Sequence, residues 1–426
     1  MLIQAARVVD PTGPHHGQIV DLRLTDGRIA EIGSDLSPAD DEQVVAADDL
    51  HVSAGFVDLG AYLGEPGHEE REDITSLRAA AVAGGYTHVA VLPDTQPVRQ
   101  TVPDVAYLLR QNGDHPTDLL PLAALSHDLA GKDMTEMLDL AAAGVRVFTD
   151  GPERPVSGSL LLRTLRYAQA ADLTVMVSPF DPALAPDGQV HEGEVSVRLG
   201  LRGIPAISAT IPLAKALQLL AYTGGKMIVH LLSTAAGVAA VRSAKAEGLD
   251  VRATVSAHHL CFTDAALAGF DPNFKMLPPL RGETDRQALL DGLGDGTIDA
   301  IVSNHAARHG EEKDLEFAYA DFGALGLQTA LPQVLAMDEG HPGVDKIVAA
   351  LTTGPRQLLG LPTPGVAQGA AADLTLFRTT GDRVFTSDRL TGRTENSPLL
   401  DRPLTGEIVG LYHNGRFLSA GQPGNS

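Results

Sequence analysis

Residues 54–366 alternate between short apolar runs of strand type and Ala- and Leu-rich stretches of helix type, and this alternation restricts the fold more than any other feature. The strand-like runs include "THVAVLP", "VRVFT", "LTVMVSP", "KMIVHLL" and "IDAIVSN". Several helix-like stretches between them, such as "AAGVAAVRSAKAEG", end in glycine, a common C-cap. Repeated strand–helix units predict a parallel sheet. So many units in one segment favour an α/β fold of the (β/α)8 TIM-barrel type over an open sheet.

Both ends of the chain have the character of short strands. "IVDLRLTDGRIAEIG" and "GEIVGLYHNGRFLSAG" alternate apolar and polar residues, and Asp26-Gly27 and Asn414-Gly415 are typical of hairpin turns. We therefore expect residues 1–53 and 367–426 to build one small β-sandwich domain from both termini. This domain would flank a barrel over residues 54–366.

The composition restricts the kinds of binding partner and the cellular location that we expect. A formal net charge of −22 disfavours nucleic acid and anionic membranes, which would repel the chain. No apolar run approaches the about 18 residues of a membrane span, and the start "MLIQAARVVD" lacks the pattern of a signal peptide. A single cysteine, Cys261, excludes an intramolecular disulfide and a Cys-rich zinc site. We expect a cytoplasmic protein.

Seven segments occur in the order found in one enzyme family. They are "GFVDLGAYLGEPG", "AGGYTHVAVLPDTQP", "VFTDG", "HEGEVSVRLGLRGIP", "HHLCFTD", "NFKMLPPLR" and "DGTIDAIVSNHAARHGEEK". Together they resemble the dihydroorotases of the amidohydrolase superfamily over nearly the whole barrel. The resemblance implies a chemistry in which two zinc ions hold a hydroxide that attacks a cyclic amide, while an aspartate moves the proton. Such a site needs imidazole and carboxylate ligands and works because zinc lowers the pKa of bound water to about 7.

The strand ends, where barrel enzymes carry their chemistry, depart from this family pattern. The first strand of the family ends in Asp-x-His-x-His-x-Arg-x-Pro-Gly, whereas this chain has Asp58 followed by glycine and tyrosine at the two histidine positions. Glycine offers no ligand atom, and a phenol with a pKa near 10 is a poor one. Asparagine stands at the catalytic aspartate, which removes the proton shuttle. The former ligand positions are Gly60, Tyr62, Asp150, Ser178, Leu231 and Asn304.

The substrate positions implied by the resemblance are altered as well. Gly64 stands where an arginine would hold the substrate carboxylate, and Leu277 replaces a contacting asparagine. Asp94 replaces another asparagine and would repel the substrate carboxylate. Asn273 and His305 are retained, so these five residues form a vestigial substrate pocket.

Three histidines could still serve as ligands of a relocated metal. His230 lies one residue away from the family's ligand register, and a one-residue slip on a strand points a side chain to the other face. His258 and His259 follow a strand, where a structural role in hydrogen bonding is the competing interpretation.

These departures resemble a class of catalytically silent dihydroorotase-like subunits. The resemblance implies a structural role in assembly with aspartate transcarbamoylase, supplied as a separate chain, and a homo-oligomer (a dimer) within the complex. No catalytic residue, metal or other cofactor is expected under this hypothesis. The alternative is an active cyclic amidohydrolase that converts dihydroorotate to N-carbamoyl-aspartate with an altered or mononuclear zinc site. A third possibility is a binding module for a pyrimidine metabolite.

Overall fold

The computed structural model of the chain describes residues 1–113, 115–337 and 340–421. Parallel strands in its middle part form two arcs, in the orders β6-β7-β8 and β9-β10-β13-β14-β15. The strands are β6 (Phe56–Ala61), β7 (Tyr86–Val91), β8 (Asp118–Pro121), β9 (Val147–Phe148), β10 (Thr174–Val177), β13 (Lys226–Val229), β14 (Val251–Ser256) and β15 (Ala300–Val302).

The two arcs meet at both of their edges. An isolated parallel bridge pairs Ala123, just after β8, with Phe148 of β9. On the other side, the backbone N–H of Tyr62, just after β6, donates to the carbonyl of His305, which follows β15, at 3.0 Å. The α/β architecture with parallel strands is thus confirmed, while closure into a full eight-stranded barrel stays a prediction.

Alternate residues of these strands enter two different apolar clusters. On β7, Val89 and Val91 belong to the large cluster shared with the helices, whereas Ala90 belongs to a second cluster with Val57 and Leu59 of β6. This period of two is the one expected for a strand with both faces buried.

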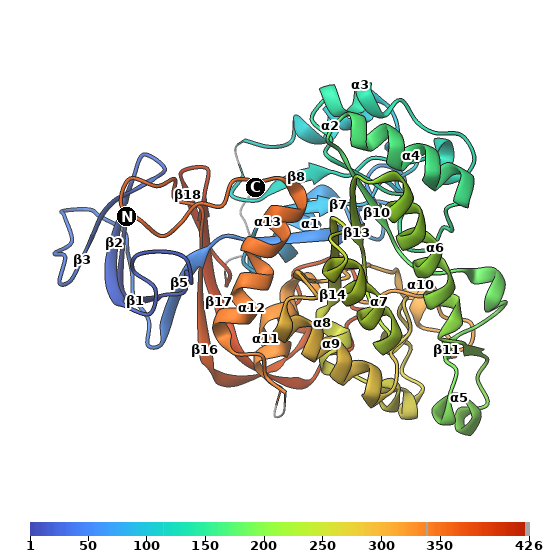
Figure 1. The fold of residues 1–426 in the computed structure, drawn as a ribbon. Coiled ribbons are helices and arrows are strands. Elements are labelled where there is room, and N and C mark those ends of the chain that lie inside the picture. Colours follow the sequence, from blue (N-terminus) through green and yellow to red (C-terminus); the bar gives the residue numbers. More distant parts are fainter. Residues whose placement is uncertain (114, 338–339, 422–426) are drawn as a thin grey trace.

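The helices follow the strands and lie around the arcs in Figure 1. They are α1 (Ile74–Ala83), α2 (Val102–Leu109), α3 (Met137–Ala142), α4 (Gly158–Ala170), α5 (Glu194–Leu199), α6 (Ile207–Thr223), α7 (Ala235–Ala246), α8 (Ala257–Cys261), α9 (Glu283–Asp295), α10 (Gly310–Lys313), α11 (Ala330–Leu335), α12 (Val344–Leu351) and α13 (Thr353–Leu359). A short pair, β11 (Val190–His191) and β12 (Gly203–Ile204), flanks α5. No helix among the described residues combines the length and the apolarity needed to cross a membrane.

Both ends of the chain contribute to one further sheet, which lies to one side in Figure 1. Its order is β18-β17-β16-β5-β1-β2-β3, and β4 pairs with β1. The strands are β1 (Leu2–Val8), β2 (Ile19–Thr25), β3 (Arg28–Gly33), β4 (Val44–Val45), β5 (Leu50–Ala54), β16 (Leu374–Phe385), β17 (Arg402–His413) and β18 (Arg416–Ser419). The predicted joining of the two termini is present as this sheet; a sandwich of two layers stays a prediction, and residues 422–426 of the expected domain lie outside the described residues.

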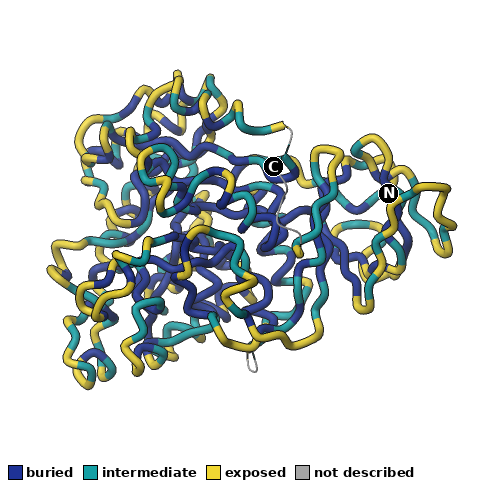
Figure 2. The backbone as a smooth tube through the Cα atoms, turned by 180° about the vertical axis from the view of Figure 1, so that it is seen from behind, coloured by how far each residue is buried: buried dark blue, intermediate teal, exposed yellow. Residues whose placement is uncertain are grey.

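A buried ion pair fixes the junction between this sheet and the strand arcs. Arg356 of α13 donates to Asp373, just before β16, at 2.7 Å and to the carbonyl of Gly55 at 2.9 Å. Both charged side chains are buried, at 2% and 6% relative exposure. Figure 2 shows that buried residues are concentrated in the larger part of the molecule.

Candidate functional site

The C-terminal ends of the strands bring Gly60 of β6 and His230, just after β13, into direct contact. A Cβ atom built on Gly60 would lie 2.6 Å from Nε2 of His230, closer than real Cβ contacts come. Gly60 also has a φ of +92°, which a side-chain-bearing residue rarely adopts. The imidazole therefore fills the space in which a side chain at position 60 would start.

Strand alternation brings His230 to this position, because Ile228, two residues earlier, already belongs to the second apolar cluster, which Leu59 shares. The next residue, Leu231, has a φ of +59°, so the chain does not continue as a regular strand. The side chain of Leu231 is buried in the same apolar cluster as Leu59. The one-residue offset predicted from the sequence thus does not turn His230 away from Gly60.

His230 is held as a neutral, buried imidazole. Its Nδ1 contacts the hydroxyl of Thr254 at 3.0 Å, and Nε2 has no hydrogen-bond partner among the described residues. Complete burial lowers the pKa of His230 to about 3. The ring keeps one nitrogen free, but that nitrogen points at the backbone of Gly60.

Tyr62 belongs to a polar group at the same strand ends. The Arg308 guanidinium lies over its ring at 5.4 Å from the centroid, and its hydroxyl donates to Glu153 at 3.5 Å. Burial, with the nearby carboxylates of Glu153 and Asp94, raises the pKa of Tyr62 well above its ordinary value. Tyr62 is therefore a protonated phenol at neutral pH and a poor metal ligand.

The two aspartates retained at the strand ends are occupied by hydrogen bonds from serines. Asp58 accepts from the backbone N–H and the hydroxyl of Ser303, both at 2.7 Å. Asp150 accepts from the N–H of Ser126 at 2.9 Å and from its hydroxyl at 2.6 Å. Burial raises the pKa of both carboxyl groups. Asp58 thus ties β6 to the segment after β15, and Asp150 ties the segment after β9 to the loop that contains Ser126.

His258 and His259 face protein partners. His258 contacts Oε1 of Gln333 at 3.0 Å through Nδ1 and the carbonyl of Leu325 at 3.2 Å through Nε2. His259 donates through Nε2 to the carbonyl of Pro278 at 3.0 Å, while its Nδ1 has no partner among the described residues. Burial lowers the pKa of each to about 4. Both rings are neutral at pH 7, so His258 donates through only one nitrogen, although three of the four ring nitrogens lie within 3.2 Å of a protein oxygen.

His305 forms a buried pair that the sequence did not indicate. Its Nε2 lies 2.8 Å from a carboxylate oxygen of Glu72, and both side chains are 2% exposed. Nδ1 accepts from the N–H groups of Gly326 and Leu327 at 3.3 and 3.4 Å, which places the proton on Nε2. The ring is thus oriented toward Glu72.

The other predicted pocket residues make local contacts. Asn304 has a left-handed φ of +50° and donates through Nδ2 to the carbonyl of Leu277 at 3.3 Å. Asn273 lies in a turn in which its N–H donates to Asp271. The hydroxyl of Ser178 is buried with no partner among the described residues. Hence none of these groups completes a cluster of ligands.

Gly64 sits in a tight turn that has no room for a side chain. A Cβ atom at this position would lie 2.1 Å from the carbonyl oxygen of His68 and 2.6 Å from that of Glu72. Since both are backbone atoms, they cannot rotate away as a flexible side chain would.

Comparisons with known proteins identify the family. Residues 51–236 match the family described as dihydro-orotase-like. A dihydroorotase from Anaeromyxobacter dehalogenans (strain 2CP-C) is 36% identical over 422 residues, which cover 98% of this chain and 97% of that protein. A dihydroorotase from Syntrophotalea carbinolica is 36% identical over 424 residues, covering 98% of each.

The chain belongs to the dihydroorotase family.

Solved structures agree with this fold. The L-hydantoinase (dihydropyrimidinase) from Arthrobacter aurescens superposes with a TM-score of 0.84 at 22% identity, covering 98% of this chain and 95% of that one. The dihydropyrimidinase from Brevibacillus agri gives 0.82 at 18%, covering 98% and 94%. At these identities the likeness concerns the fold alone.

The donors present at the strand ends do not fit the two-zinc centre that the dihydroorotase resemblance implies. Zinc takes imidazole, thiolate or carboxylate ligands, and five of the six former ligand positions hold Gly60, Tyr62, Ser178, Leu231 and Asn304. The sixth, Asp150, is engaged with Ser126 through both oxygens. The one imidazole nearest the first position, His230, is packed on the backbone of Gly60.

The pH dependence of stability tests the role of Asp94 in the altered pocket, the group of five residues named above as the vestigial substrate pocket. Its Oδ1 is buried and has no hydrogen-bond partner among the described residues, and burial together with Glu153 raises the pKa of Asp94 to about 6. The folded state therefore holds this proton more tightly than the unfolded chain does, so the protein loses stability as the pH rises from about 4 to about 6. Asp94→Asn, which restores the residue typical of dihydroorotases, is expected to raise the free energy of unfolding at pH 7.5 by about 1 kcal/mol.

Urea unfolding at pH 4.5, 6 and 7.5 checks this expectation. The gain of Asp94→Asn over the natural chain should grow with pH, while Asp48→Asn, at an exposed position, should leave the profile unchanged. An equal gain at all three values would contradict the assignment of the effect to this carboxyl.

One group of metal-type ligands was missed by the sequence analysis. Among the described residues, His88, Asp118 and His413 are the group of three whose possible ligand atoms all lie within 4.8 Å of one another. His88 and Asp118 lie near the N-terminal ends of β7 and β8, far from the strand ends at which barrel enzymes carry their chemistry. The three residues are widely separated in sequence, and only the pairing of the strands brings them together.

Proposed function

We propose that this member of the dihydroorotase family is catalytically inactive and acts as a structural subunit of pyrimidine biosynthesis, assembling with aspartate transcarbamoylase supplied as a separate chain. The contact between His230 and Gly60 carries the proposal, because an imidazole edge occupies the place from which the first metal ligand would extend. Under this proposal the strand ends hold no catalytic residue and no catalytic metal.

The replaced proton shuttle supports the same conclusion. Asn304 offers an amide, which cannot take up a proton near neutral pH, and its Nδ2 already donates to Leu277. The substrate carboxylate would meet Asp94 in place of an amide, and Gly64 in place of a guanidinium. Binding and proton transfer are therefore both disfavoured.

The architecture we infer for this role is a closed (β/α)8 barrel over residues 54–366 with a β-sandwich domain from residues 1–53 and 367–426. The second apolar cluster contains residues of both arcs. Leu59 and Ala90 come from one arc, and Val147, Met176 and Val302 come from the other. The backbone bond from Tyr62 to His305 supports closure on the opposite side.

The surface offers a candidate docking area on α5 and α6. Val197 is 82% exposed and Tyr222 71%, and Ile207 and Ile211 on the same side of α6 are exposed at 53% and 52%. Both helices lie on the side of the molecule away from the terminal sheet (Figure 1). Large apolar side chains exposed in one region are typical of interaction sites.

Co-expression with the aspartate transcarbamoylase of the same organism tests the proposal. We expect one peak in size-exclusion chromatography that contains both chains and is larger than the peak of either chain alone. The double variant Val197→Glu and Ile211→Glu should weaken this association, while Val384→Glu, at a 50% exposed position on the terminal sheet, should not. Separate elution of the two natural chains at micromolar concentration would refute the assembly.

A second function is favoured by the names of the relatives. Proteins 36% identical to this chain are named dihydroorotase, and within the part of the chain that the structure describes, His230 and His259 each keep one nitrogen without a partner. An active cyclic amidohydrolase with an altered or mononuclear zinc site would use these nitrogens. In that case turnover must depend on added zinc, a result that the first proposal forbids.

A further inference from the structure

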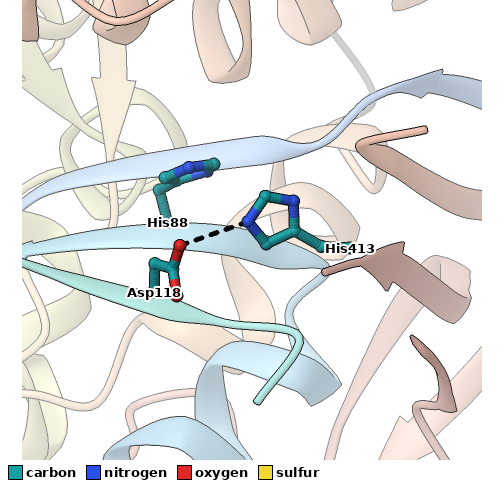
Figure 3. Close-up of side chains that lie close together, drawn as sticks. All are labelled: His88, Asp118 and His413. Carbon is teal, nitrogen blue, oxygen red and sulfur yellow. Dashed lines mark hydrogen bonds and ion pairs between the residues drawn. The ribbon is translucent and has the colours of Figure 1, made fainter. Parts of the chain in front are cut away.

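His88, Asp118 and His413 converge from three different strands at the end of the arcs opposite to the altered pocket. His88 belongs to β7, Asp118 is the first residue of β8, and His413 is the last residue of β17. Figure 3 shows the two imidazoles and the carboxylate turned toward one another, with Nε2 of His413 at 3.3 Å from Oδ2 of Asp118. The cluster thus bridges the barrel strands and the terminal sheet.

The outer contacts of the three side chains hold them in this orientation. The Nδ1 atom of His413 lies 3.6 Å from Oδ1 of Asp373, and that oxygen is buried without a hydrogen-bond partner among the described residues. Nδ1 of His88 lies 3.0 Å from the hydroxyl of Thr87. A ring nitrogen held by a carboxylate or a hydroxyl leaves the other nitrogen directed at a metal, which is how metal-ligating histidines are usually oriented.

The charges around the cluster leave room for a cation. Asp373 also accepts from Arg356 at 2.7 Å, so the guanidinium that acts on His88 is already paired with a carboxylate. Asp118 supplies a carboxylate next to the two imidazoles. A cavity of about 640 Å³ is lined by His88, Asp373 and His413 and provides a route from solvent.

We propose that His88, Asp118 and His413 bind a divalent transition-metal ion, with Zn²⁺ as the best match, which fastens the barrel strands to the terminal sheet. Two imidazole nitrogens and one carboxylate oxygen are a common zinc donor set, and a water molecule can complete four-coordination. Zinc–ligand distances of about 2.0–2.1 Å place tetrahedral ligand atoms about 3.3 Å apart. Binding therefore draws the three groups, now within 4.8 Å, closer together and tightens the junction.

The proposed site does not depend on the proposed function. It lies at the N-terminal ends of the strands, and its ligands are not among the residues of the altered pocket. A metal bound there would be structural, whether or not the opposite strand ends carry out chemistry.

Metal titration of the full chain after chelator treatment tests the site. We expect one equivalent of Zn²⁺ per chain, a rise of a few degrees in the melting temperature at saturation, and d–d absorption of a tetrahedral site when Co²⁺ is used. Asp118→Asn and His413→Gln are expected to weaken Zn²⁺ binding at least about tenfold. His16→Gln, which removes an exposed histidine of the terminal domain, should bind as the natural chain does.

Two variants show where the metal binds and allow the proposal to be tested even if one substitution prevents folding. His230→Gln alters the opposite strand ends and should retain the equivalent of Zn²⁺. Asp118→Asn is nearly isosteric, so it reports on the site even if His413→Gln fails to fold. The proposal is overturned if the natural chain binds no Zn²⁺, if Asp118→Asn binds it as tightly as the natural chain, or if His230→Gln alone abolishes binding.

Discussion

The purified chain supplied with Zn²⁺ is expected to hydrolyse dihydroorotate at less than about one ten-thousandth of the rate of an active relative. General-base catalysis alone is worth about 10²–10⁴-fold, and Asn304 cannot provide it. Loss of the metal-bound hydroxide removes the nucleophile as well. The general base and the metal-bound hydroxide act in the same chemical step, so the effects of losing them are not additive. Restoring only one of the two groups therefore recovers little activity.

The dihydroorotase from Anaeromyxobacter dehalogenans, 36% identical to this chain, is a suitable positive control in the same assay. Asn304→Asp tests the dependence between the two losses, because it returns the carboxylate but leaves Gly60, Tyr62 and Leu231 in place. We expect this variant to remain at the level of the natural chain. Zinc-dependent turnover by the natural chain, with stoichiometric metal, would contradict inactivity and favour the second function.

The strand–helix rhythm of the sequence was a reliable guide to the large features. Apolar runs such as "THVAVLP" became β7, and the hairpin signals at Asp26-Gly27 and Asn414-Gly415 lie between paired strands of the terminal sheet. Glycine positions and the period of apolar residues determine turns, strands and helices through local interactions. These elements can therefore be predicted without knowledge of distant contacts. Family membership followed from the order of the motifs.

The details of the altered pocket depended on geometry that no pattern encodes. A left-handed conformation at Leu231 is uncommon for a branched aliphatic residue, and it lets Leu231 follow His230 into the same interior cluster as Leu59. The partner of His305, Glu72, is separated from it by 233 positions, so the pair could not be inferred from either segment. The sequence did not indicate the cluster of His88, Asp118 and His413 for a related reason, because its residues come from three strands that only the fold brings together.

Gly64→Arg, which restores the arginine that the dihydroorotase resemblance places at this position, is expected to destabilise the chain by at least about 3 kcal/mol. The new Cβ would lie 2.1 Å from the carbonyl of His68 and 2.6 Å from that of Glu72. The turn must therefore open, although the N–H of His68 donates to the carbonyl of Gly64 at 2.6 Å within it. Moving Glu72 also weakens its buried pair with His305, and an unpaired buried charge is costly.

Urea denaturation with fluorescence or circular dichroism measures the effect, and the choice of variants separates backbone from side chain. Gly64→Ala carries the same Cβ without the guanidinium, so most of the loss should already be present in it. Gly294→Ala lies in α9 with no atom within 4 Å of the new Cβ, and it should be neutral or stabilising by up to about 1 kcal/mol because alanine favours the helix. If Gly64→Arg proved as stable as the natural chain and bound dihydroorotate, the turn would have to be adaptable. The missing arginine would then be a reversible loss of a substrate contact, and the steric argument for a permanently altered pocket would fail at this position.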